Sequence, residues 1–402
     1  MKCPGDATEG VKALSNVQGR PGATNVAALV QGGALTGVWQ AQATTTIPEL
    51  FGPLPGQARL TGNENPFGPA PSAVRAMKET VGLSCYYPDR AVMRLTDMIA
   101  ERFGLSFGQI ILGSGTTELL CATALAWGQK GSVICPELFW DAPINYAARK
   151  GVRCIRVPMD AGVGINLDGM ADLLDDSVAL VHIVNPNNPT GRLLDNQALR
   201  AFSEKVEACG ATLLVDEAYN EMTDLPDENS LVDLVRAGRN VIVTRTFSKI
   251  YGMAGTRMGY ALASEEHIAR IRGYVTSFGG NVAGLAGAIA SFNDQPFLEA
   301  SLRAIREGRN MILHAVAAAG YAALPSQANF VFVDVLDADA LRDAMANRGI
   351  LVRGAFGEKW SRYSRVSVGT PDDTRRYADA LVQISNGQDA AAWSARAYEA
   401  DR

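Results

Sequence analysis

The sequence predicts an α/β protein with a large domain, built on a mostly parallel sheet between helices, and a smaller α+β domain. From about Ile110, near-continuous apolar segments alternate with helical segments, as in a sheet that is buried on both faces. After about Gly280, apolar and polar residues alternate, which is typical of half-exposed strands. The length of 402 residues also exceeds that of a typical single core.

Each element of the larger part follows from a local pattern. Strands are expected where short apolar runs end in glycine or polar residues, and helices where apolar residues recur at helical spacing. The expected strands lie in 109–115, 132–137, 152–159, 178–191, 211–219 and 240–249. The expected helices lie in 116–128, 142–151 and 196–209. In the smaller part, 328–335 and 363–370 are expected strands, and 338–349 is an expected helix.

These patterns divide the chain into parts. We expect a large domain over 96–285 and a smaller one formed by 47–95 and 286–390, followed by a tail at 391–402. Residues 1–46 show no clear helix or strand period. They are interpreted either as a loosely ordered extension or as a weak export signal, so the expected location is cytoplasmic unless that signal operates.

Composition argues against several classes of protein. The net charge is −5, with no cluster of lysine or arginine, so no nucleic-acid partner is expected. No apolar run reaches the roughly 18 to 20 residues that a membrane span needs. Six scattered cysteines and three distant histidines predict no metal site. His182 lies in an apolar run and is expected to be a hydrogen-bonded core histidine.

Polar residues follow four of the predicted strands at the point where each strand ends. They occupy 114–117, 185–188, 216–219 and 246–249. Ligands of parallel sheets collect beyond the carboxyl ends of the strands. The sequence therefore predicts one site at this edge of the sheet.

Lys249 is the candidate reactive group of that site. A carbonyl cofactor needs an amine that bonds to it and later moves a proton. Thr246 and Ser248 add hydroxyls beside the lysine, and Arg257 adds a guanidinium suited to bidentate phosphate binding. On its own, such a lysine is a solvated surface charge.

The glycine-rich turn before residue 118 predicts the other half of a phosphate cradle. Gly115, Thr116 and Thr117 would present backbone N–H groups at a helix N-terminus, where anions bind. Glycine–helix junctions are also common structural turns, so this motif alone is weak evidence for a phosphate site.

Asp216 ends an apolar run, where a carboxylate is costly unless it meets a cation. A protonated pyridine nitrogen is such a cation, and Tyr219 and Asn188 are candidates to hydrogen-bond a ring oxygen beside it. The alternatives are that Asp216 caps the next segment and that 185–191 is only a tight turn.

Eight motifs in order resemble the class I/II pyridoxal-phosphate aminotransferases, and most of all their histidinol-phosphate aminotransferase subgroup. They are "TGNENPFGP", "YYPD", "GSGTTE", "NPNNPTG", "VDEAY", "RTFSKIYGMAGTRMGY", "SQANFVFV" and "YSRVSVGT". The resemblance covers roughly residues 59 to 385.

The resemblance implies a fold type I enzyme, pyridoxal 5'-phosphate as cofactor, and a homodimer with active sites at the subunit interface. It implies an amino donor and a 2-oxo acid acceptor. Lys249 would be the Schiff-base lysine and proton carrier, and Asp216 the partner of the ring nitrogen. The residues expected around the ring oxygen and the phosphate are Tyr219, Asn188, Gly115, Thr116, Thr117, Thr246, Ser248 and Arg257, with Tyr87 from the neighbouring subunit.

Other roles follow from the same resemblance. Arg365 would bind the substrate carboxylate, and Asn63 would also belong to the substrate site. An aromatic side chain should stack on the ring, with Trp140 preferred over Phe139. Arg353 is either a second anion contact or a surface salt-bridge partner.

The sequence departs from the subgroup at two positions. Tyr86 stands where arginine is usual, and Phe67 where tyrosine is usual. Histidinol phosphate as the substrate therefore stays open. So do two alternatives to transamination: another reaction of the same cofactor (decarboxylation, racemisation, elimination or cyclisation) and a non-catalytic sensor.

Overall fold

A seven-stranded sheet forms the centre of the molecule in this computed structural model, which describes residues 51–276 and 280–387. Its strand order is β2-β8-β7-β6-β5-β3-β4. The strands are β2 (Ile110–Gly113), β3 (Ser132–Pro136), β4 (Cys154–Val157), β5 (Val178–Val184), β6 (Thr212–Asp216), β7 (Val241–Thr246) and β8 (Gly259–Leu262). The extension and the tail predicted at 1–46 and 391–402 lie outside the described residues.

All neighbours in this sheet are parallel except around β8, which runs antiparallel to both β2 and β7. The predicted mostly parallel sheet is thereby confirmed, and β8 is an element that the sequence did not predict as a strand. In the register of β6 and β7, Asp216 lies opposite Thr244. Two of the polar strand ends are thus side by side.

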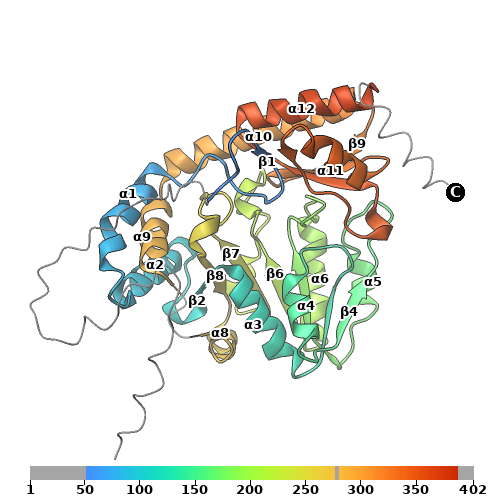
Figure 1. The fold of residues 1–402 in the computed structure, drawn as a ribbon. Coiled ribbons are helices and arrows are strands. Elements are labelled where there is room, and N and C mark those ends of the chain that lie inside the picture. Colours follow the sequence, from blue (N-terminus) through green and yellow to red (C-terminus); the bar gives the residue numbers. More distant parts are fainter. Residues whose placement is uncertain (1–50, 277–279, 388–402) are drawn as a thin grey trace, which may run out of the picture. The chain divides into compact units, whose positions relative to one another are not determined.

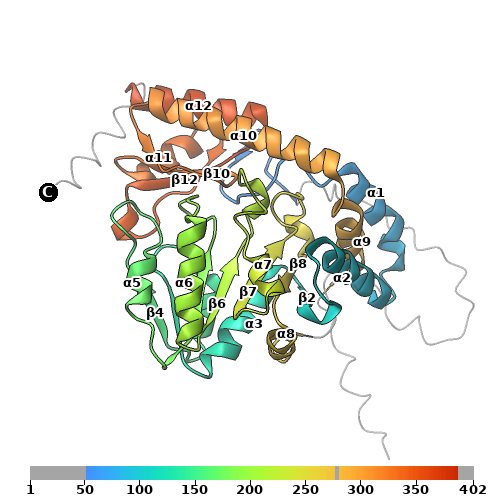
Figure 2. The ribbon, with the colours of Figure 1, turned by 180° about the vertical axis from the view of Figure 1, so that it is seen from behind.

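Helices cover both faces of the sheet (Figures 1 and 2). The helices α3 (Thr116–Gly128), α4 (Ala142–Ala148) and α8 (Glu265–Arg272) lie on one face. The helices α5 (Leu167–Ala171), α6 (Asn196–Ala208) and α7 (Val232–Arg236) lie on the other. Parallel strands require this covering because both of their faces carry apolar side chains.

Side chains alternate along each strand, so successive side chains pack against the helices on opposite faces of the sheet. Leu180 and Leu214 join the apolar cluster that contains α3 residues. Leu213 and Val215 join the cluster on the other side, which includes Phe202 of α6. Neighbouring residues on a strand therefore face different helices. The same alternation places neighbouring polar residues at the strand ends on opposite faces of the sheet.

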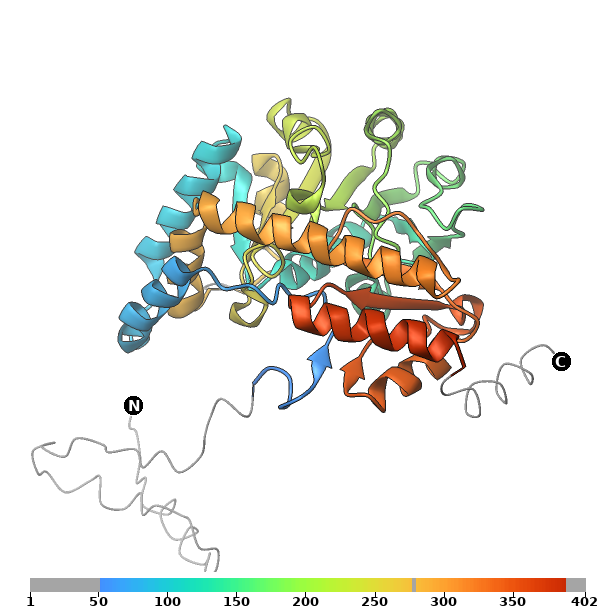
Figure 3. The same ribbon diagram turned by 90° about the horizontal axis from the view of Figure 1, so that it is seen from above.

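A smaller set of strands lies beside this sheet. In it, β10 (Phe330–Asp334) pairs antiparallel with β12 (Tyr363–Ser367) and with β9 (Ala322–Ala323), while β1 (Ala58–Arg59) pairs with β11 (Ile350–Leu351). The helices α10 (Gln295–Ala318) and α12 (Pro371–Ser385) run side by side, and α11 (Ala338–Ala346) completes the layer (Figure 3). This confirms the α+β character predicted for the second part.

Three further helices pack together next to β2. These are α1 (Pro71–Thr80), α2 (Asp89–Phe103) and α9 (Val282–Ser291), and α2 also contacts β2 itself. The predicted boundary between 285 and 286 falls within α9, and the exact domain limits remain a prediction. Short 3-10 turns complete the chain at Val81–Leu83, Phe107–Gln109, Asn220–Met222, Ala254–Thr256 and Glu358–Trp360.

Within the described residues, every helix is either too short or too polar to cross a lipid bilayer. The same part of the chain holds no group of three or more histidine, cysteine, aspartate or glutamate residues arranged to bind a metal ion.

Candidate active site

Lys249 lies just beyond the carboxyl end of β7, as its place in the sequence predicted. Its Nζ donates hydrogen bonds to the carbonyl oxygens of Gly62 (3.4 Å) and Asn63 (3.2 Å). It lies 5.5 Å from the centre of the Tyr219 ring. The lysine also lines a cavity of about 300 Å³ together with Asp216 and Trp140. Its amine therefore faces a site and is not a solvated surface charge.

The predicted phosphate cradle is assembled from two strand ends. The hydroxyl of Thr246 lies 2.9 Å from that of Ser248, and Arg257 Nη1 lies 3.4 Å from the Ser248 hydroxyl. Thr116 and Thr117, at the first turn of α3, line the same cavity. Hydroxyls, a guanidinium and a helix N-terminus therefore meet, which is a suitable environment for a dianion.

Close backbone packing brings these two strand ends together. A Cβ atom on Gly259 would lie 2.6 Å from the backbone nitrogen of Thr116. A Cβ atom on Gly115, whose φ is +74°, would lie 2.3 Å from Arg257 Nη2. Glycine is favoured at Gly259 because the backbone of Thr116 leaves no space, and at Gly115 because its φ is positive and a Cβ atom would displace the Arg257 guanidinium.

Asp216 is buried at the end of β6, and none of the described residues places a cationic group within hydrogen-bonding distance of it. Thr244 donates a hydrogen bond to its Oδ1 (3.0 Å). Burial raises the pKa of Asp216 to about 6, against the opposing effects of the Thr244 and Ala218 hydrogen bonds and of Lys249. A protonated pyridine nitrogen would supply the missing cation and reverse this shift.

Tyr219 connects two other predicted residues, Asn63 and Asn188. Its hydroxyl accepts hydrogen bonds from the Nδ2 atoms of Asn63 and Asn188, each at 3.2 Å. Asn63 has a left-handed backbone, with a φ of 53°. Its Oδ1 accepts a hydrogen bond from the Ser367 hydroxyl (2.7 Å). The segment before α1 is thereby fixed across the site.

Arg365 and Arg353 lie together in a second cavity of about 450 Å³, which Trp140 and Asn188 also line. Their backbones are paired by two hydrogen bonds of 3.0 and 3.1 Å. Arg365 donates to Asn188 Oδ1 (2.5 Å) and to the Thr61 carbonyl (2.6 Å). Its buried Nε has no hydrogen-bond partner among the described residues.

The electrostatics of this cavity favour an anion. Arg365 is almost fully buried, and burial lowers the pKa of its guanidinium. A buried cation without a matching carboxylate is costly. Arg353 lines the same cavity, and none of the described residues forms a salt bridge with it, which does not support the surface salt-bridge alternative.

Of the two candidate aromatic side chains, only Trp140 lines both cavities. Phe139 lines the second one but is buried, and its ring packs edge-on against His182 with centres 5.4 Å apart. Neither ring nitrogen of His182 has a partner in the described chain, so the expected hydrogen-bonded core histidine is wrong in that respect. Burial accordingly lowers the pKa of His182 to about 3.

Tyr87 is not brought to either cavity. It lies between the 3-10 turn Val81–Leu83 and α2, with 77% of its surface exposed. Tyr86 beside it is 70% exposed. The resemblance assigned Tyr87 to the site of a neighbouring subunit, and that role stays a prediction.

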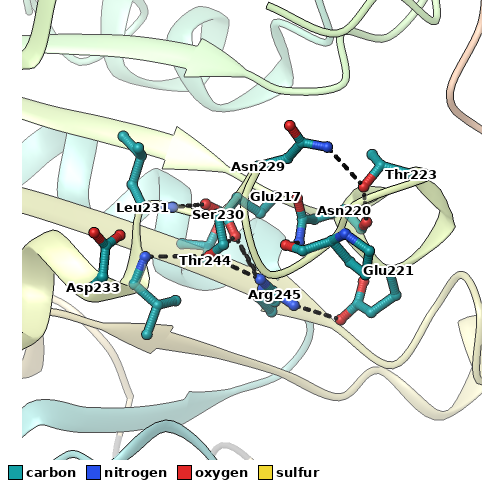
Figure 4. Close-up of polar contacts among 12 residues, drawn as sticks. Glu217, Asn220, Glu221, Thr223, Asn229, Ser230, Leu231, Asp233, Thr244 and Arg245 are labelled. Atoms are coloured by element: carbon teal, nitrogen blue, oxygen red, sulfur yellow. Dashed lines mark hydrogen bonds and ion pairs between the residues drawn. The ribbon is translucent and has the colours of Figure 1, made fainter. Parts of the chain in front are cut away.

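The reverse face of β6 and β7 carries an ion network that the sequence analysis missed (Figure 4). Arg245 Nη2 lies 2.8 Å from Glu217 Oε2, and Arg245 Nη1 lies 3.2 Å from Glu221 Oε1. Ser230 and the backbone of Leu231 also hydrogen-bond to Glu217. The available signal was an arginine within the apolar run of β7, because a buried charge requires a partner.

Two features of the segment before α1 were also missed. Glu64 lines the cavity of Lys249, although only its neighbour Asn63 was predicted. In addition, Gly68 abuts Gly252, three residues after the lysine. A Cβ atom on Gly252 would lie 2.5 Å from the Gly68 Cα atom, and one on Gly68 would lie 2.8 Å from the Gly252 Cα atom.

The donor set therefore fits pyridoxal phosphate. The cavity offers an amine, a buried acid that has no cationic partner among the described residues, a set of hydroxyls with a guanidinium, and an indole beside them. Each group matches one part of the cofactor: the aldehyde, the ring nitrogen, the phosphate and the ring face. The individual roles of these residues remain predictions.

Comparison with known proteins gives the same assignment. The family model described as "Aminotransferase class I and II" matches residues 55–381. Histidinol-phosphate aminotransferases of Akkermansia muciniphila and Symbiobacterium thermophilum are 33% and 35% identical to this chain. The alignments cover 81% and 80% of this chain, and 89% of each relative.

Solved structures agree with this assignment. A putative histidinol-phosphate aminotransferase from Erwinia carotovora atroseptica has a TM-score of 0.79 at 29% identity, covering 83% of this chain and 97% of that one. The histidinol-phosphate aminotransferase from Sinorhizobium meliloti, in complex with pyridoxal-5'-phosphate, has a TM-score of 0.76 at 28% identity. That match covers 87% of this chain and 99% of the other.

These findings confirm the predicted fold type I architecture, the predicted enzyme class and the predicted cofactor. They favour transamination over the other reactions and the sensor that the sequence left open. The chain belongs to the class I and II aminotransferases, which are pyridoxal-phosphate enzymes.

Proposed function

We propose that this aminotransferase takes its amino group from histidinol phosphate and passes it to a 2-oxo acid. The observation that carries the proposal is the pair of arginines, Arg365 and Arg353, in one cavity next to that of Lys249. A phosphate monoester, with its two negative charges, fits a pair of guanidiniums better than a single carboxylate group would. The names of the relatives support the same donor.

The residues around Lys249 would divide the work. When bound, pyridoxal phosphate supplies an aldehyde and an electron-withdrawing ring that acidifies the Cα–H bond of the donor. Asp216 would keep the ring nitrogen protonated, and Tyr219 and Asn188 would hydrogen-bond the ring oxygen. Lys249 Nζ would remove the proton from Cα of the donor and deliver it to the former aldehyde carbon of the cofactor.

The remaining predicted residues would hold the cofactor in place. Arg257, Ser248, Thr246 and the first turn of α3 would bind the phosphate. Trp140 would stack on the ring and exclude water from one face. Its position at the border of the two cavities supports this role.

The donor proposal is tested by steady-state kinetics of the purified holoenzyme with 2-oxoglutarate as acceptor. Histidinol phosphate should give the highest kcat/KM in a panel with phenylalanine, tyrosine and glutamate. A preference for phenylalanine or tyrosine would identify an aromatic amino-acid aminotransferase instead. That second candidate is favoured by the rings of Phe330 and Phe356, which lie 5.5 and 5.8 Å from the Arg365 guanidinium.

We also propose that the enzyme is a homodimer. Val81, Leu83, Tyr86, Tyr87 and Met93 are each more than half exposed and lie in one stretch of chain. Exposed apolar clusters of this kind are typical of protein interfaces. The resemblance to the family supports a second copy as the partner, with Tyr87 reaching the phosphate of that copy.

Analytical ultracentrifugation tests this assembly and should give twice the chain mass. A Tyr87→Phe variant should remain dimeric but bind the cofactor more weakly. A monomer with full activity would refute both the assembly and the shared site.

A further inference from the structure

Glu64 is the acidic residue of the Lys249 cavity that the proposed mechanism leaves unused. Among the described residues lining that cavity, the only carboxylates are Asp216 and Glu64. Asp216 is committed to the ring nitrogen of the cofactor. Glu64 therefore remains available to interact with the substrate.

The position of the Glu64 carboxylate is closely defined. Its Oε1 lies 2.9 Å from Arg59 Nη2. Its Oε2 covers the backbone of Gly62, because a Cβ atom on Gly62 would lie only 2.2 Å from it. The Gly62 carbonyl in turn accepts a hydrogen bond from Lys249 Nζ. The carboxylate thus lies over the peptide that the reactive amine contacts.

The backbone around Glu64 is also held in place. Asn329 Nδ2 donates to the carbonyl oxygens of Asn63 (3.1 Å) and Glu64 (3.2 Å). Asn63 and Asn65 on either side are buried, and Asn65 Nδ2 donates to the Ile250 carbonyl (2.7 Å). Glu64 therefore projects from a fixed segment, as precise recognition of a ligand requires.

The two cavities share Trp140 and Asn188, but each has its own charged groups. Arg365 and Arg353 lie in one, and Lys249 and Glu64 in the other. A donor whose amine meets Lys249 and whose anion meets the arginines has one substituent left at Cα. In the cavity of Lys249, the Glu64 carboxylate is a hydrogen-bond acceptor for that substituent.

We propose that the Glu64 carboxylate accepts a hydrogen bond from an N–H group of the donor's side chain and thereby selects an imidazole over a phenyl ring. This inference rests on the proposed donor and adds the group that recognises its ring. The same negative charge disfavours donors with an acidic side chain. Glu64 is a specificity residue, and Gly62 is the glycine that gives its carboxylate space.

A merely structural role for Glu64 makes a different prediction. If the Arg59–Glu64 pair only supported the segment before α1, its loss would affect all donors alike. The donor pair histidinol phosphate and phenylalaninol phosphate separates the two cases, because these molecules share the amine and the phosphate and differ in the ring.

The experiment compares the two donors in single-turnover reactions of the wild-type holoenzyme and the Glu64→Gln variant. The variant keeps the shape of the side chain and removes its charge. We expect kcat/KM for histidinol phosphate to fall by roughly 10- to 100-fold, as is usual when a hydrogen bond to a charged group is weakened. The value for phenylalaninol phosphate should stay within about twofold of the wild type.

Two controls sharpen the result. Glu79→Gln removes an exposed charge from α1 and should leave both donors unchanged. Arg59→Gln removes the ion-pair partner while leaving the Glu64 carboxylate, so the preference for imidazole should survive. Calorimetry of both donors with the Lys249→Ala variant, with and without Glu64→Gln, gives a readout that does not depend on turnover.

Each outcome decides a different point. Equal losses for the two donors, or an unchanged ratio, overturn the role of Glu64 and leave the proposed function intact. A wild-type enzyme that is inert towards both phosphates but active on amino acids overturns the proposed donor, and the inference with it.

Discussion

The two faces of the β6–β7 pair each carry a buried carboxylate, and the two carboxylates differ in their ion-pair partners. Asp216 lines the cavity of Lys249 and accepts hydrogen bonds from Thr244 and the Ala218 backbone, but it has no ion-pair partner among the described residues. Glu217, the next residue, faces the reverse side and is paired with Arg245 at 2.8 Å (Figure 4). Both acids are buried, Asp216 as the last residue of β6 and Glu217 directly after it.

The two carboxyl groups share the main influence on their pKa values but differ in the groups that oppose it. Burial raises the pKa of both acids. For Glu217 the charge of Arg245 opposes the effect, together with hydrogen bonds from Leu231 and Ser230. Arg245 thus neutralises Glu217 within the protein, whereas we propose that the ring nitrogen of the cofactor neutralises Asp216. Substitutions on the two faces should accordingly affect different properties.

The largest effect is expected on the cofactor face. Lys249→Ala should lower turnover by roughly a thousandfold or more, because it removes the only amine among the described residues that line the cavity. The melting temperature should change little, since Lys249 is not part of the reverse-face network. Turnover assays and thermal unfolding measure the two properties. Full transamination by this variant would refute the role of the lysine.

On the reverse face the effect should be on stability. Arg245→Met leaves Glu217 buried without its partner and should cost about 3–5 kcal/mol in the free energy of unfolding. Urea unfolding measures this loss. The double variant Arg245→Met/Glu217→Gln removes both charges and should recover much of it. A double variant as unstable as the single one would show that packing, and not the unpaired charge, dominates.

The stability of the cofactor-free protein should depend on pH through Asp216. In the cofactor-free protein the pKa of Asp216 is raised from 3.8 to about 6, so the folded state binds its proton more tightly than the unfolded state does. The stability that this proton contributes is complete below about pH 4 and lost as the pH rises through 6. Asp216→Asn should therefore stabilise the cofactor-free protein by up to roughly 3 kcal/mol at pH 8.

The gain should shrink as the pH falls and vanish near pH 4. Thermal unfolding of the two cofactor-free proteins between pH 4 and pH 8 gives the comparison. A constant difference across this range would mean that Asp216 keeps its ordinary pKa.

Arg365→Ala tests the anion cavity beside the cofactor face. It should raise the donor KM by roughly a hundredfold, because it removes a buried charge contact to the substrate. The cofactor affinity should change far less, since Arg365 lies in the other cavity. Equal losses in donor and cofactor binding, measured by spectral titration, would count against this division.

The smallest effect is expected at the edge of the reverse-face network. Glu221 is partly exposed, and its contact with Arg245 is longer than that of Glu217, at 3.2 Å. Glu221→Gln should therefore cost less than about 1 kcal/mol of stability. A cost as large as that of Arg245→Met would place Glu221, and not Glu217, at the centre of the network.

The sequence predicted those parts of the fold that local patterns determine. The apolar runs of β5 and β6 and the polar residues after them are visible along the chain, and one edge of a parallel sheet gathers them. The strand β8 was not predicted because its four residues acquire their role only by pairing with β2 and β7. The helix α10 was likewise not assigned.

The site residues that the sequence did not predict were missed for the same physical reason. Lys249 and Asp216 were predicted because their chemistry is unusual in their local context. Arg245 and Glu64 were missed because their partners, Glu217 and Arg59, cannot be assigned without the fold. The missing hydrogen bonds of His182 could not be predicted either, because they depend on every side chain packed around it.

The contact between Gly68 and Gly252 has an evolutionary consequence. A replacement at either position collides with the backbone of the other. No second mutation can relieve the collision by making a side chain smaller, because both partners already lack one. We therefore expect intolerance of double as well as single substitutions at this pair, and a combinatorial library covering both positions would reveal whether any joint solution exists.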